Sequence, residues 1–139
     1  MVDQKMIARI FTDFRDLYTG KAVAGIHALC EKYKNHRMLM ALLSNMDEAV
    51  KLDVPAAMKE IYSFYKEYRG LDLTDEDWAV IVQSVSRMAT DNGDNRWYRG
   101  VILEIVNILE SDDRERRRIA KEVEKEMEEA ARAAEQEAA

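Results

Sequence analysis

Two histidines and the only cysteine have the clearest potential for chemistry, and they lie within ten positions of one another. His27 and Cys30 are three residues apart, about one turn of a helix, and His36 follows a short distance on. All three can bind zinc, but a structural zinc site needs four closely spaced ligands, and the sequence offers no fourth. We therefore interpret them as a helix-face histidine, a buried cysteine and a turn histidine, and we expect no metal and no cofactor.

The sequence contains no other recognisable catalytic arrangement. No serine, cysteine or lysine stands in a motif with a histidine base, and the five glycines are scattered rather than gathered in a phosphate-binding loop. The four acids between residues 72 and 77 are explained by a helix start, whose positive end favours carboxylates. The turn at residues 91–95 lacks the terminal glutamate of a calcium loop. We expect a protein that is not an enzyme.

One basic cluster could contact phosphate. It comprises Arg114, Arg116, Arg117 and Arg118. Acids at positions 112, 113 and 115 reduce its local charge, so we interpret it as a solvated helix face. The alternative is that these arginines contact RNA or DNA, which makes a nucleic-acid-contacting accessory protein the second functional hypothesis.

The elements that must position these residues are helices. Apolar residues recur at helical spacing, and no segment alternates with the period of a strand. The second stretch is marked by Val23, Ile26, Cys30 and Tyr33, and the others fall at 3–19, 39–50, 54–69, 75–90 and from 95. The clearest helix start in the sequence is Thr74, a capping threonine that precedes three acids. The sequence predicts an all-α fold, a compact bundle of five to six helices.

Composition changes after Glu110. From Ser111 onward, large apolar side chains occur at only three positions, four residues apart. They are Ile119, Val123 and Met127. The surrounding arginine, glutamate, lysine and alanine favour a helix that has little to bury. We divide the chain into a bundle domain, residues 1–110, and a charged helical C-terminal extension, residues 111–139, that projects from it. Ser111 could also cap a new helix, so a kink there stays open.

Composition also indicates one intracellular domain. The 139 residues, 47% of them hydrophobic, suit a single domain with a real core. The 27 acids and 21 bases give a net charge of -6, which attracts neither nucleic acid nor anionic membrane. No apolar run is long enough to span a membrane, and a lone cysteine fits a reducing compartment. We expect a cytoplasmic protein without membrane contact.

The stretch from Leu71 to Trp78, followed after a short turn by a hydrophobic closing helix, resembles small all-helical proteins carried by bacterial phages and mobile elements. The resemblance covers residues 71–110. It implies a protein without catalytic motifs that binds and blocks a host protein, as inhibitors of CRISPR nucleases do. It assigns no functional residue.

The leading hypothesis is therefore a non-catalytic protein-binding module, with an inhibitor of a bacterial defence complex as the form that the resemblance implies. The expected partner-binding residues are Arg114, Arg116, Arg117, Arg118, Ile119, Val123 and Met127. An enzyme is the third hypothesis. Because the stripe is shorter than the three to four heptads of a convincing coiled coil, we expect a weak homo-oligomer or a contact with another protein.

Overall fold

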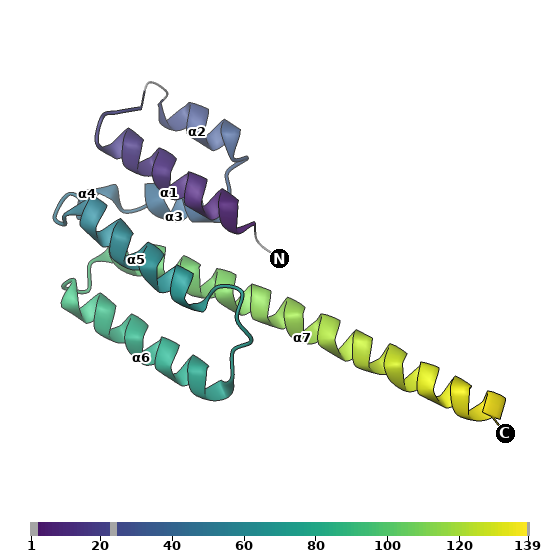
Figure 1. Ribbon diagram of the computed structural model, residues 1–139. Coiled ribbons are helices and arrows are strands. Elements are labelled where there is room, and N and C mark those ends of the chain that lie inside the picture. The colour runs from purple at the N-terminus through teal and green to yellow at the C-terminus, as the bar shows by residue number, and fades with distance from the viewer. Residues whose placement is uncertain (1–2, 23–24, 139) are drawn as a thin grey trace.

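The computed structural model describes residues 3–22 and 25–138, and every regular element in these ranges is a helix (Figure 1). The helices are α1 (Gln4–Tyr18), α2 (Ile26–Lys32), α3 (Arg37–Leu43), α4 (Met46–Ala49), α5 (Val54–Tyr68), α6 (Asp75–Asp91) and α7 (Arg96–Ala138). The predicted all-α class is confirmed. Val23, which helped to predict the second helix, lies outside the described residues.

Local capping explains why α5 and α6 begin and end where the sequence predicts. The carboxylate of Asp53 accepts a hydrogen bond from a first-turn backbone N–H of α5. Thr74 and Asp77 form a reciprocal capping box, in which each side chain accepts from the other residue's backbone N–H. Gly70 follows α5 with a φ of 74°, a left-handed conformation that glycine adopts without steric cost.

The apolar stripe at 39–50, predicted as one helix, forms two. Ser44 is extended, and Asn45 has a φ of 57°, so the backbone turns left-handed between α3 and α4. Asparagine tolerates this conformation better than most residues. The apolar spacing continues across the break, and Leu42 of α3 and Ala49 of α4 are both fully buried. The split gives seven helices in the described ranges.

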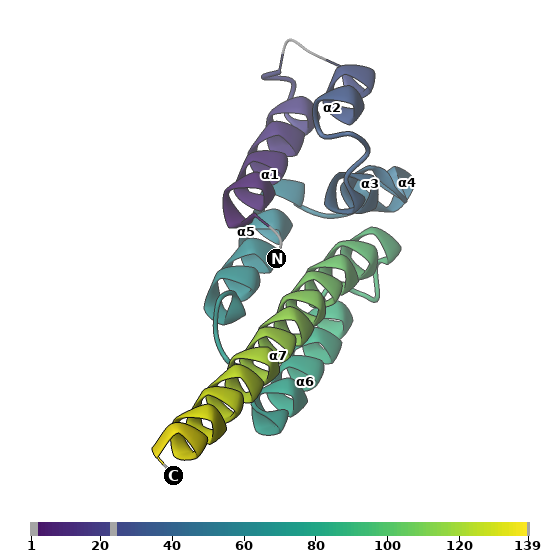
Figure 2. The ribbon, with the colours of Figure 1, turned by 90° about the vertical axis from the view of Figure 1, so that its right-hand side faces the viewer.

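The first half of α7 is the central element of the bundle. It packs against α3, α4, α5 and α6, and Figure 2 shows α5 and α6 on either side of it. Trp97, at its start, is fully buried and donates a hydrogen bond from Nε1 to the carbonyl of Leu42 at 2.8 Å. Further along the same helix, the side chains of Ile105 and Leu109 are also buried.

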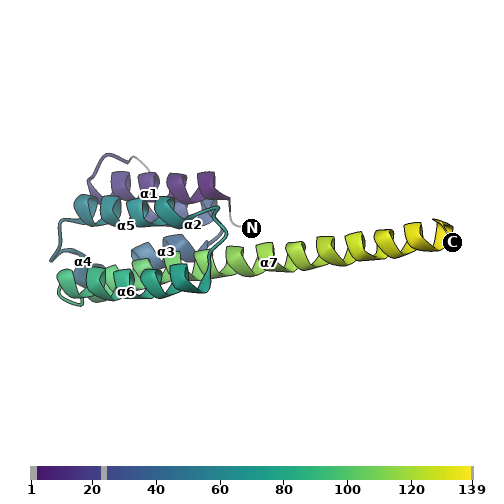
Figure 3. The ribbon, with the colours of Figure 1, turned by 60° about the horizontal axis from the view of Figure 1, so that its bottom comes forward.

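The second half of α7 projects away from the bundle. The helix runs without interruption for 43 residues, so the kink left open at Ser111 does not occur. Asp112 and Asp113 lie within the helix and are buried against the body rather than serving as caps. From residue 117 to 138 every side chain is exposed, and this segment, which we call the tail, extends beyond all other elements (Figures 1 and 3). The predicted projection is confirmed.

Candidate protein-binding surface on the C-terminal helix

The three large apolar residues of the tail lie where no other described element covers them. Ile119 is 40% exposed, Val123 48% and Met127 68%. We call this row the tail stripe. A shallow apolar groove runs along it, lined by Ala120, Val123, Glu124, Met127, Glu128 and Ala131. A row of apolar side chains at helical spacing on an exposed helix is the pattern by which helices dock into partner grooves.

The tail stripe continues the face that α7 buries in the bundle. Counting outward, this face carries positions 105, 109, 112, 116, 119, 123 and 127, each separated from the next by three or four residues. Such spacing keeps side chains on one side of a helix. Ile105, Leu109 and Asp112 are 0%, 1% and 3% exposed, so the face is covered up to the point where the body ends. The tail therefore carries apolar side chains on the side that α7 buries in the bundle, and no other described element covers them there.

Polar contacts fix the direction of α7 where it leaves the body. Trp78 of α6 donates from Nε1 to Oδ2 of Asp113 at 3.2 Å, and Nε of Arg117 lies 3.0 Å from the same oxygen. Arg116, whose side chain is only 16% exposed, pairs with the carboxylate of Asp72 at 3.8 Å. We call these five residues the collar. They hold α7 to α6 and to the loop that precedes α6.

The structure uses three of the four predicted arginines for contacts within the chain. Besides its place in the collar, Arg117 donates to the carbonyl of Leu73 at 3.1 Å. Arg118 pairs with Glu115 one turn earlier on α7, and its hydrogen bond lowers the pKa of that carboxyl below its ordinary value. Within the described residues, only Arg114 of the four is recorded without an ion pair. The cluster therefore offers little unpaired positive charge to a phosphate.

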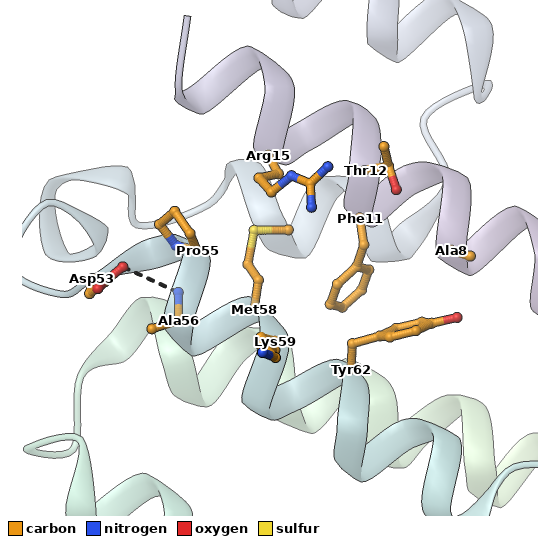
Figure 4. Close-up of a pocket in the computed structure, with 10 residues that line it drawn as sticks. All are labelled: Ala8, Phe11, Thr12, Arg15, Asp53, Pro55, Ala56, Met58, Lys59 and Tyr62. Carbon is orange, nitrogen blue, oxygen red and sulfur yellow. Dashed lines mark hydrogen bonds between the residues drawn. The ribbon is translucent and has the colours of Figure 1, made fainter. Parts of the chain in front are cut away.

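An open depression between α1 and α5 is the other candidate surface (Figure 4). Phe11 and Tyr62 face each other across it with ring centroids 5.5 Å apart, and Met58 lies beside them. Arg15 borders it, while the carboxylate of Asp53 is already used as the cap of α5. Its lining combines apolar side chains with the charged groups of Arg15, Asp53 and Lys59.

The zinc-competent residues have structural partners of other kinds. Nδ1 of His36 accepts from the backbone N–H of Met38 at 3.0 Å and caps α3, and Nε2 of His27 lies 3.0 Å from the carboxylate of Glu31. Cys30 packs, partly buried, against the core. In the ranges that the structure describes, no three histidine, cysteine or carboxylate side chains gather as metal ligands do.

The sequence did not predict a polar contact that joins α1 to the C-terminal end of α2. Asp13 accepts hydrogen bonds from the phenol of Tyr33 and from Nζ of Lys32, the latter at 2.8 Å. Burial opposes ionisation of Asp13, but these two donors outweigh it and lower the pKa of its carboxyl. No local signal in the sequence joins residues about twenty positions apart, so only the packing of the two helices reveals this contact.

Comparisons with protein families, with curated proteins and with solved structures find no match to this chain. No helix in the described part of the chain is both long and apolar enough to cross a bilayer.

Proposed function

We propose that this chain is a non-catalytic protein-binding module whose contact surface is the tail stripe, Ile119, Val123 and Met127. Its main support is the continuity of the buried face of α7 with these exposed residues, because the side of the helix that the body covers continues, through Asp112 and Arg116, to these three apolar side chains. The collar adds rigidity, since it fixes the direction in which the tail projects.

The free energy available from burying the tail stripe is moderate. Complete burial of one large aliphatic side chain is worth about 1.5–3 kcal/mol, and the three side chains are 40% to 68% exposed. Covering them therefore contributes on the order of 3 kcal/mol before the entropic cost of association. That gain alone gives weak binding, so the charged residues beside the stripe must supply the remaining affinity and the choice of partner.

The resemblance of residues 71–110 to phage and mobile-element proteins suggests the setting: a cytoplasmic protein that binds and blocks a component of a bacterial defence complex of the CRISPR type. The nucleic-acid alternative has weaker support, because Arg116, Arg117 and Arg118 already have carboxylate partners. A salt titration separates the two, since phosphate contacts make affinity fall steeply with salt and apolar contacts do not.

Affinity capture with matched variants tests the proposal. The full chain, Val123→Glu and the control Val82→Glu are immobilised and exposed to bacterial lysate. Val82 is 64% exposed on α6, so the control adds the same charge at another exposed valine. A protein retained by the full chain and by Val82→Glu, and lost with Val123→Glu, supports the tail stripe as the contact. Equal retention by all three proteins contradicts it.

A further inference from the structure

Glutamates border the tail stripe on both sides. One row lies on the side of the apolar groove and comprises Glu124 and Glu128. The other row comprises Glu122, Glu126 and Glu129. At 3.6 residues per turn, all five lie about 60–140° around the helix from Val123, the middle residue of the stripe. We call these two rows the acidic borders.

The bases of the tail beyond the collar lie on the far side of the helix. They are Arg118, Lys121, Lys125 and Arg132. All four lie about 140–180° around the helix from Val123, so they face away from any partner that covers the stripe. The side of the tail that carries the stripe is therefore apolar at its centre and negative at its edges.

Three of the five border glutamates are free to meet a partner's charge. Arg118 pairs with Glu122 at 2.8 Å, and Arg132 lies 3.8 Å from Glu128. Within the described ranges, the other three glutamates form no ion pair. They are Glu124, Glu126 and Glu129.

The acidic borders disfavour a second copy of the chain on the stripe. In a parallel pair of tails, each border lies beside the opposite border of the other helix. In an antiparallel pair, each border lies beside its own equivalent. Both arrangements bring rows of glutamate together, and like charges beside an apolar seam destabilise the pairing of two helices.

The shape of the stripe suits a single partner helix. Its three large side chains form one narrow row, which Ala130 and Ala134 continue towards the C-terminus. A row of this width is covered by one helix, and the charged residues beside such a seam determine which helix pairs with it. Negative borders select a partner helix whose own seam is bordered by lysine or arginine.

We propose that the tail stripe binds a basic amphipathic helix of another protein, whose lysines or arginines pair with the acidic borders. The inference rests on the proposed function, since it names the chemistry of the partner for the same surface. Exposed ion pairs contribute little individually, so the apolar contact holds the two helices together and the borders discriminate between partners.

Two designed helical peptides test the sign of the partner's charge. Both carry the same row of leucines, flanked by lysines in one peptide and by glutamates in the other. Fluorescence anisotropy of the labelled peptides measures their binding to the full chain. The lysine peptide binds at least about tenfold more tightly than the glutamate peptide. Equal affinities, or no binding of the lysine peptide, overturn the inference.

Charge-reversal variants locate the contact on the tail. Glu124→Lys combined with Glu126→Lys changes one unpaired residue of each border and weakens binding of the lysine peptide about tenfold. The control combines Glu67→Lys with Glu110→Lys, which makes the same change in net charge at two exposed positions outside the tail. The control variant binds the lysine peptide as the full chain does. An equal loss in both variants shows attraction to the net charge of the chain and overturns the inference.

Val123→Glu separates failure of this inference from failure of the proposed function. If both peptides bind the full chain equally and neither binds Val123→Glu, the tail stripe is a contact surface without charge preference. The inference then fails and the proposed function stands. Sedimentation velocity gives the other contrary outcome, because a dimer of the full chain that Val123→Glu abolishes shows that a second copy covers the stripe.

Discussion

Two truncations should separate the part of α7 that stabilises the bundle from the part that projects. Truncation after Arg118 removes only exposed side chains, so the free energy of unfolding should change by less than about 0.5 kcal/mol, as for other surface changes. Truncation after Glu110 also removes the α7 half of the collar. Trp78 then loses its carboxylate acceptor, a hydrogen bond to a charged group worth about 1.5–3 kcal/mol.

The other collar contacts contribute less. The side chain of Arg117 is 55% exposed, so solvent screens its ion pair with Asp113, and exposed pairs of this kind contribute at most about 1 kcal/mol. We therefore expect truncation after Glu110 to leave a folded, cooperatively melting bundle that is about 2–4 kcal/mol less stable. Urea unfolding followed by tryptophan fluorescence measures both variants. Equal stability of the two truncations would refute the structural role of the collar and favour a boundary at residue 110.

Three further measurements test the core and the titratable groups. Ile81→Ala should cost about 2–5 kcal/mol in urea unfolding, because Ile81 is fully buried on α6, and a loss below about 0.5 kcal/mol would show that this face is not core. Burial, together with the charge of Asp112, raises the pKa of the Tyr65 phenol to about 12. The unfolded chain then ionises first, so stability should fall as pH rises from about 10 to 12, whereas equal urea midpoints at pH 9 and 11 would contradict the burial of Tyr65. A chelator should leave the thermal midpoint unchanged, and a drop that zinc restores would reveal a metal site at His27 and Cys30.

Local signals in the sequence predicted most of the fold. The bounds of α5 and α6 follow from a capping aspartate, a capping threonine and a glycine stop, all of which act within one turn. The division between α3 and α4 could not be predicted in this way, because the apolar spacing continues across Ser44 and Asn45. Only the left-handed backbone at Asn45 reveals it.

The candidate surface could be predicted in part. The spacing of Ile119, Val123 and Met127 identified the tail stripe, but its continuity with the core face depends on α7 running straight through Ser111. Serine followed by two acids is equally suited to a helix start, so the sequence left that point open. The hydrogen bond from Arg117 to the carbonyl of Leu73 depends on how the loop before α6 lies against α7, which no local pattern encodes.

Photo-cross-linking tests most directly whether proteins bind the tail stripe. A photoreactive phenylalanine analogue is placed at residue 123, or at residue 82 as the matched exposed control, in the full chain expressed in bacterial cells. We expect a covalent adduct between residue 123 and a protein, either a second copy of the chain or another partner, and no such adduct from residue 82. The absence of any protein adduct at residue 123 while the chain is folded would contradict it.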